Sequence, residues 1–232
     1  MDLKPVGRTL LRDQAYVAIK QAIVAGALAP GQVVRDHDLA ERLGFSRAPV
    51  RDALARLADE GLVESKPQSH TRVTPLILRD VRDALVVVRT MHEVATRSAV
   101  PRLSGDDIAT MRAANAEFAG AVRRGDVERA LRADDTLHDV LVAVCGNRAV
   151  AATIDRYTPL IRRLERQRFT TLPGEGSVRR HEELIRACAS GDADAAADIT
   201  ATIWSSLDEI LQADLAGGPV RAPHDDLPEE MP

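Results

Sequence analysis

Residues 36–60 read DHDLAERLGFSRAPVRDALARLADE, and this run decides the fold of the first third of the chain. Apolar residues recur at helical spacing on both sides of the step Gly44-Phe45-Ser46. Gly44 can adopt the left-handed conformation that ends a helix, and Ser46 is a good N-cap for the next one. Two helices, over 36–43 and from Ser46 to about 60, separated by such a step predict a helix-turn-helix.

The flanking sequence extends this unit in both directions. A helical apolar pattern runs over about 10–25 and stops at Gly26. After Gly61, residues 62–66 and 71–74 are typical of two strands joined by a short turn. The expected headpiece, residues 1–75, therefore has three helices and a β-hairpin wing.

Two arginines lie where such a headpiece meets DNA. Arg47 and Arg51 are four residues apart at the start of the third helix. That end of a helix-turn-helix enters the major groove, where a guanidinium can pair with O6 and N7 of guanine. The alternative is a solvated helix face. The position of the arginines between the turn and the wing favours DNA contact.

Charge and composition set the broad class. The net charge is −4, but the first 75 residues hold 11 basic and 9 acidic residues, so the acidic excess lies in the remainder. No apolar run approaches the roughly 20 residues that span a bilayer, and the N-terminus lacks a signal-peptide pattern. Cys145 and Cys188 form no disulfide framework. We expect a soluble, cytoplasmic protein without a membrane partner.

The rest of the chain reads as helical. Because only 3% of residues are aromatic, the core must be built mainly from aliphatic side chains. Gly, Pro and Asp breaks separate six helical patterns, at 79–100, 105–124, 126–145, 148–168, 177–190 and 192–215. We predict a mainly α fold, with the winged helix-turn-helix followed by an all-α six-helix bundle over 76–216. Residues 217–232 hold four prolines and acidic pairs and are expected to be a disordered acidic tail.

Three polar residues interrupt the apolar stripes of this bundle. Asp134 and His138 occupy consecutive turns on the inner face of one helix, and His181 lies on the inner face of another. A buried carboxylate is costly unless it is paired or bound to a cation. The three residues predict a metal site of the His₂Asp type with open positions. The alternative is an internal Asp–His hydrogen bond beside an unrelated core histidine.

The headpiece resembles a known family. Pro30-Gly31, the run LAERLG at 39–44, the run SRAPVRDAL at 46–54 and GLV at 61–63 are similar to the winged helix-turn-helix of GntR-type bacterial transcription regulators. The resemblance covers about residues 10–75 and implies that Arg35, Arg47 and Arg51 contact DNA and that the wing tip reaches the minor groove. His70 stands where the family usually has glycine, and either contacts DNA or is an exposed loop residue. The expected DNA-binding set is Arg35, Ser46, Arg47, Arg51 and His70.

The helical part resembles the FCD effector domain of the FadR branch of this family, and its six helices resemble the VanR subgroup. The resemblance implies a small effector, often an organic acid, and a homodimer. Asp134 and His138 match the family's Asp-x-x-x-His motif and His181 its next metal ligand, whereas the third histidine is replaced by Ile203. A divalent metal (Zn, Ni or Mn) is therefore implied with one ligand missing.

Two residues of the first effector-domain helix complete the candidate sites. Arg89 resembles the family's effector-anchoring arginine, and its alternative is a dimer-surface or solvent-facing position. His92 lies on the inner stripe and is a candidate to compensate for the missing ligand, within an effector-binding set of Arg89 and His92.

The predicted function is a ligand-responsive repressor that binds double-stranded operator DNA as a homodimer and is released by a small carboxylate effector. The alternative is a metal-dependent hydrolase that uses Asp134, His138 and His181. The sequence contains no H-E-x-x-H, Walker A, nucleophile-elbow or dinucleotide motif, so we expect no enzyme.

Overall fold

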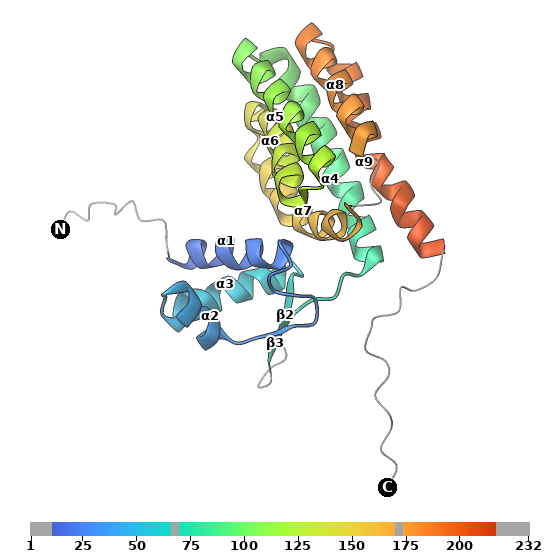
Figure 1. Cartoon of the computed structure of the whole chain (residues 1–232). Coiled ribbons are helices and arrows are strands. Elements are labelled where there is room, and N and C mark those ends of the chain that lie inside the picture. Colours follow the sequence, from blue (N-terminus) through green and yellow to red (C-terminus); the bar gives the residue numbers. More distant parts are fainter. Residues whose placement is uncertain (1–10, 66–69, 170–173, 217–232) are drawn as a thin grey trace, which may run out of the picture.

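The computed structural model describes residues 11–65, 70–169 and 174–216 and places a small headpiece against one end of a helical bundle (Figure 1). The headpiece contains α1 (Leu11–Val24), β1 (Val33–Val34), α2 (Asp36–Leu43), α3 (Arg47–Asp59), β2 (Val63–Ser65) and β3 (Thr71–Val73). The bundle contains α4 (Leu78–Ala99), η1 (Val100–Arg102), α5 (Gly105–Arg124), α6 (Val127–Cys145), α7 (Arg148–Arg168), α8 (Gly174–Ser190) and α9 (Ala193–Ala216).

The mainly α fold with a winged headpiece is confirmed, and most helix ends agree with the predicted ones within two residues. The exception is α8, which begins at Gly174 instead of residue 177. A Cβ added at Gly174 would lie 2.5 Å from Cγ1 of Val122 on α5. Glycine therefore lets the first turn of α8 pack closely against α5.

The wing contains one more strand than predicted. The sheet has the order β1-β3-β2, with Val33 opposite Arg72 and Val63 opposite Val73. β1 is only two residues long, too short for an alternating pattern to be recognised. It ties the segment before α2 to the wing. The loop at 66–69 lies outside the described residues.

The turn of the helix-turn-helix depends on two residues. Gly44 has φ +68°, the left-handed conformation that ends α2. Ser46 occupies the N-cap of α3, but its side chain makes no capping hydrogen bond. The third helical residue is Pro49, which has no N–H to donate. Ser46 is exposed, and its hydroxyl makes no capping hydrogen bond to α3.

The headpiece and the bundle have separate apolar cores that meet at α7. Tyr16, Ile19, Leu54 and Leu57 belong to the headpiece core. Leu160 of α7 packs both against that core and against a bundle cluster formed by α4, α7 and α9. The two units are thus joined through a helix of the bundle as well as through the chain.

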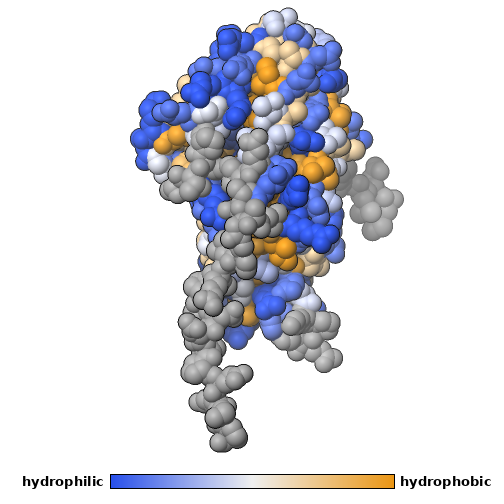
Figure 2. All heavy atoms as spheres, turned by 90° about the vertical axis from the view of Figure 1, so that its right-hand side faces the viewer, coloured by the Kyte–Doolittle hydropathy of each residue, from blue (hydrophilic) through white to orange (hydrophobic). Residues whose placement is uncertain are grey.

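The surface seen in Figure 2 is mainly hydrophilic, with small separate apolar patches. Two of the exposed large apolar residues, Val86 and Val94, lie on α4 and are 52% and 45% exposed. Within the described residues, no helix is both long and apolar enough to cross a membrane.

Candidate DNA-binding face and effector pocket

The predicted DNA-binding residues of the helix-turn-helix are all exposed. Arg35 precedes α2, and Ser46, Arg47 and Arg51 lie at the start of α3. Asp36, which sequence reasoning missed, joins the two helices, because its Oδ2 lies 3.0 Å from Nη2 of Arg47 and 4.0 Å from Nε of Arg51. The carboxylate orients the guanidinium of Arg47 by hydrogen bonds and pairs only loosely with that of Arg51, on the face expected to meet DNA.

His70 lies directly before β3 and is partly buried. Residues 66–69, the remainder of the expected wing tip, lie outside the described part of the chain. The contact of His70 with DNA therefore stays a prediction.

The three candidate metal ligands come together inside the bundle. Asp134 and His138 come from α6, and His181 comes from α8. Oδ1 of Asp134 lies 3.8 Å from Nε2 of His138 and 3.3 Å from Nε2 of His181. One potential ligand atom from each residue lies within 4.8 Å of the other two. The histidines are 2% and 0% exposed, whereas Asp134 is partly buried, so both imidazole rings are shielded from bulk solvent.

The orientation of His181 follows from a neighbouring amide. Nδ2 of Asn115 donates to the backbone oxygen of Val178 at 3.2 Å, which turns Oδ1 of Asn115 toward His181. Nδ1 of His181 lies 3.1 Å from that oxygen and must donate to it. Nε2 then faces the Asp134 carboxylate without forming a hydrogen bond. An imidazole nitrogen and a carboxylate oxygen this close repel each other unless a proton or a metal ion lies between them. His181 and Asp134 therefore fit a bound cation.

The charge states also suit a metal. Burial lowers the pKa of His138 to about 4, so its imidazole is neutral near pH 7. Burial alone would raise the pKa of Asp134, but the positive charge of Arg162 holds that pKa well below its ordinary value. The site therefore offers one carboxylate and two imidazole groups, a donor set that divalent transition metals accept.

A buried arginine borders this cluster and was not found from the sequence. Arg162 of α7 is 5% exposed and donates to Oδ2 of Asp134 at 2.6 Å, to Oδ1 of Asp135 at 2.6 Å and to Oε2 of Glu165 at 2.5 Å. Burial raises the pKa of Glu165 to about 7, because one guanidinium cannot compensate three carboxylates fully. The arginine fixes the Asp134 carboxylate through the oxygen that faces away from the histidines.

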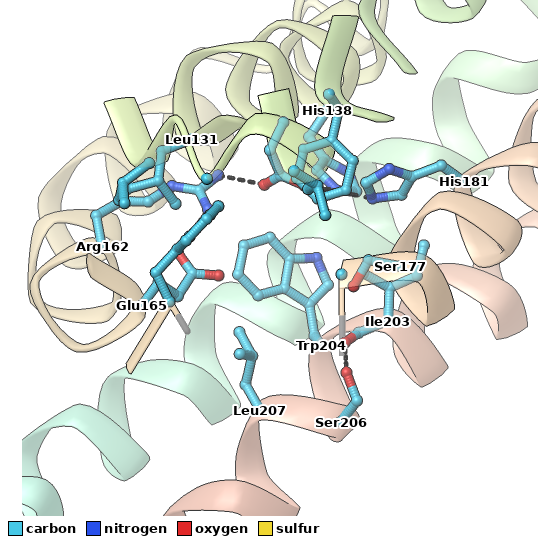
Figure 3. A pocket seen from close by; sticks show the side chains of 17 residues that line it. Leu131, His138, Arg162, Glu165, Ser177, His181, Ile203, Trp204, Ser206 and Leu207 are labelled. Carbon is cyan, nitrogen blue, oxygen red and sulfur yellow. Dashed lines mark hydrogen bonds and ion pairs between the residues drawn. The ribbon is translucent and has the colours of Figure 1, made fainter. Parts of the chain in front are cut away.

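A cavity of about 340 Å³ opens beside the cluster (Figure 3). Its polar lining includes Asp134, His138, Arg162, Glu165 and His181. Much of the remaining wall is apolar, with residues such as Phe118, Val122, Leu131, Ile203, Trp204 and Leu207. Ile203 thus lies in the same cavity as the cluster, at the position where the resemblance implies a histidine.

The two residues predicted for effector binding lie in different places. His92 is buried, with its ring stacked on Trp204 at 4.7 Å and 5.5 Å from the ring of His138. Arg89 is not among the residues that line this cavity, and its Nη1 donates to Oγ of Ser205 at 3.2 Å. The structure therefore brings His92, but not Arg89, to the cluster.

The helix that carries Arg162 also holds the headpiece. On α7, Arg156 donates to the backbone oxygen of Asp59 at 2.6 Å, Arg163 to that of Thr74 at 2.5 Å and Arg166 to that of Val24 at 2.8 Å. These oxygens lie at the end of α3, just after β3 and at the end of α1. Helix α7 therefore contacts both the polar cluster and three separate segments of the headpiece.

Proline in α7 adds a fourth contact. Pro159 lies inside the helix and has no N–H for the backbone oxygen of Asp155, four residues earlier. Nζ of Lys20 on α1 donates to that oxygen at 2.8 Å and lies 2.9 Å from Oδ1 of the same residue. The backbone oxygen that Pro159 leaves without an intrahelical hydrogen bond thus binds the headpiece instead.

A second cavity, of about 780 Å³, lies between α1 and the helices α6 and α7. Its lining includes Tyr16, Lys20 and Val24 of α1, and it shares Leu131, His138, Arg162 and Trp204 with the first cavity. The polar cluster is therefore bordered on one side by a space that reaches the headpiece.

These features define a class of protein: a winged helix-turn-helix with exposed arginines, attached to a helical domain that encloses a polar pocket, is the architecture of a ligand-responsive DNA-binding regulator. Comparison with known proteins agrees. Residues 11–73 match the model of the bacterial regulatory proteins of the gntR family, and residues 83–206, more than half of the chain, match the FCD domain. The chain belongs to the GntR family of regulators that carry an FCD domain, and it is a DNA-binding transcription regulator.

Relatives with similar sequences are named as transcription regulators. The chain is 23% identical over 186 residues to the HTH-type transcriptional repressor RspR of Escherichia coli, covering 80% of this chain and 82% of the relative. It is 30% identical over 195 residues to an HTH-type transcriptional regulator in an unstable DNA locus of Streptomyces ambofaciens, covering 80% and 78%. It is 25% identical over 189 residues to a probable D-xylose utilization operon transcriptional repressor of Paenarthrobacter nicotinovorans, covering 82% and 83%.

A solved structure, that of McbR/YncC of Escherichia coli, has a TM-score of 0.80 at 20% identity and covers 90% of this chain and 100% of that one. At this identity the likeness concerns the fold. The names of the relatives describe regulators, and the hydrolase alternative draws no support from them.

Proposed function

We propose that the protein is a homodimeric repressor that leaves its operator when a small carboxylate binds in the FCD domain. Two of the relatives above are named as repressors, which supports this sign of regulation. We assign DNA binding to residues 1–75, and effector binding and dimerisation to residues 76–216. The six helices α4–α9 of the described bundle support placement in the FadR branch and its VanR-like subgroup.

The proposed ligand of the pocket is a carboxylate bound at a divalent metal, Zn, Ni or Mn. Asp134, His138 and His181 would hold the metal, which would supply positive charge and open coordination positions. The neutral state of His138 and the unpaired Nε2 of His181 support this assignment. Without a metal, the net charge of the cavity disfavours an anion, because Arg162 is already paired with three carboxylates.

DNA recognition would use the exposed face of α3. Arg47 and Arg51 would read bases in the major groove, Arg35 and Ser46 would contact the backbone, and His70 would contact DNA from the wing. Two headpieces related by a dimer axis would read two half-sites of a near-palindromic operator.

The observation that carries the proposal is the double role of α7. Arg162 binds Asp134, whereas Arg156, Arg163 and Arg166 of the same helix bind the headpiece. A ligand that changes the position of the Asp134 carboxylate acts on the helix that positions the headpiece. Such a ligand binds one headpiece arrangement better than the other and so shifts the DNA-binding equilibrium.

The test is a titration of labelled promoter DNA from beside the protein's own gene, with and without Zn²⁺ and straight-chain carboxylates of two to six carbons. We expect retardation without the acids and release with metal and acid together. His181→Ala should bind the DNA but no longer respond. Failure of the wild-type protein to retard this DNA at low salt, with or without the acids, contradicts the proposal.

A further inference from the structure

Trp204 presents an unused hydrogen-bond donor to the effector pocket. It lies on α9, directly after Ile203, and is only 3% exposed. Its Nε1 is buried and has no hydrogen-bond partner among the described residues. A buried donor left without a partner is destabilising, because it has lost its hydrogen bonds to water and gained none in the protein. Such groups are rare in folded proteins and call for an explanation.

The surroundings of the indole direct this donor into the cavity. The ring is held by stacking on His92, with an angle of 19° between the planes. Its centre lies 5.6 Å from that of His138, and Figure 3 shows the nitrogen on the side of the ring that faces the histidines. The donor therefore points toward the region beside Asp134, His138 and His181.

Two neighbouring donors are already engaged. The guanidinium of Arg162 binds Asp134, Asp135 and Glu165, and the hydroxyl of Ser206 donates to the backbone oxygen of Ile203 at 2.7 Å. An indole N–H donates and never accepts, so its missing partner must carry an acceptor. An oxygen of a ligand in this cavity meets that requirement, whereas a protonated amine does not.

We propose that the indole N–H of Trp204 anchors the effector by donating a hydrogen bond to one of its carboxylate oxygens. This inference rests on the proposed effector function and adds the residue that selects for an acceptor oxygen. Trp204 lies beside the position where the resemblance implies a third histidine. The chain thus has a neutral hydrogen-bond donor next to the place where the family has a metal ligand.

The test separates metal binding from acid binding. Calorimetry first measures Zn²⁺ binding to the wild-type protein and to Trp204→Phe, which keeps an aromatic ring but lacks the N–H. It then measures the affinity of the Zn²⁺-loaded proteins for straight-chain carboxylates of two to six carbons. We expect unchanged Zn²⁺ affinity and a loss of roughly 10-fold or more in acid affinity, as for a hydrogen bond to a charged group. Leu207→Val, which enlarges the same cavity but keeps the N–H, should lose less.

A measurement on the wild-type protein guards against a variant that fails to fold. Trp204 is the single tryptophan of the chain, so one indole N–H signal is expected in a ¹⁵N-correlated NMR spectrum. Acid binding should shift this signal downfield, and butylamine should leave it unchanged. Acid binding that neither moves the signal nor weakens in Trp204→Phe overturns the role of Trp204 alone. A wild-type protein that binds Zn²⁺ but none of the acids overturns the carboxylate effector, and this inference with it.

Discussion

Among the buried charged residues, Glu165 has an effect that is easily measured, which is the dependence of the protein's stability on pH. Its pKa is raised from an ordinary 4.5 to about 7 by burial. Between these two values the folded protein binds more protons than the unfolded chain, so stability falls as the pH rises through 7. In Glu165→Gln the side chain stays neutral. We expect the free energy of unfolding of the wild type, relative to this variant, to drop by about 1–3 kcal/mol between pH 5 and pH 8.

Urea unfolding at both pH values, with a chelator present, measures this difference. Comparing the two proteins at each pH removes the contribution of the histidines, which both contain. A pH-independent difference between the wild type and Glu165→Gln would show that the carboxyl titrates normally.

Arg51 belongs to the same scale, on the DNA side. Its guanidinium is exposed and only loosely paired with Asp36. We expect Arg51→Ala to lose about 1–3 kcal/mol of discrimination at one base pair of each half-site. Binding to operator variants with single base changes measures this loss. Arg97→Ala, which removes an exposed charge from α4 in the bundle, should leave the discrimination unchanged. A uniform loss across all operator variants would place Arg51 on the phosphate backbone instead.

Single site residues could be predicted from the sequence where the apolar pattern of one helix shows which side chains point inward. Asp134, His138 and His181 interrupt regular apolar stripes, so their inward direction could be predicted, and the structure brings them together. Arg162 and Glu165 could not be found in this way. They lie in a helix rich in charged residues, and their burial arises from packing against helices that are distant in the sequence, such as α4 and α6.

At the scale of elements, helix ends were predictable because local chemistry sets them. Ser104 and Asp107 form a capping box at the start of α5, and Asn147 caps α7. Strand β1 and the headpiece contacts of α7 were not predictable. Both depend on partners far away in the sequence, such as β3 for β1 and Lys20 for Asp155.

The contact created by Pro159 gives an element-scale prediction. Lys20 satisfies the backbone oxygen that the proline leaves free, so Lys20→Met should weaken the connection between α1 and α7. We expect acid affinity to be retained and the ratio of operator affinities without and with acid to fall toward one. Coupling free energies of this kind are about 1–3 kcal/mol, which corresponds to a roughly 5- to 150-fold ratio in the wild type.

Fluorescence anisotropy of labelled operator DNA measures both affinities. Arg97→Met, which removes an ion pair with Asp194 far from the headpiece in sequence and contact, is the matched control. If Lys20→Met kept the wild-type ratio, α7 would not transmit the signal through this contact.

At the scale of the whole molecule, the exposed apolar residues of α4 are where we expect the two copies of the proposed dimer to meet. Val86 and Val94 are two turns apart on a helix whose other faces pack against α6, α7 and α9. We expect sedimentation at the mass of two chains. Val86→Glu combined with Val94→Glu should shift it to one chain and weaken operator binding, because half-site pairing is lost. Leu11→Glu, which changes an equally exposed residue of the headpiece, should sediment like the wild type. If the double variant still sediments as a dimer, the dimer contact lies elsewhere on the surface.

Three of the arginines of α7, Arg156, Arg163 and Arg166, bind the headpiece through backbone oxygens of Asp59, Thr74 and Val24, and Arg163 also donates to the hydroxyl of Thr74 at 3.3 Å. A backbone oxygen is present whatever side chain its residue carries, so this attachment depends on the path of the headpiece chain more than on its sequence. A headpiece that follows the same path but reads another operator offers the same acceptors. The junction is therefore suited to exchange. We expect that residues 76–216 of this chain, joined to the DNA-reading unit of a relative, would make a sensor that places a different gene under the control of the proposed effector.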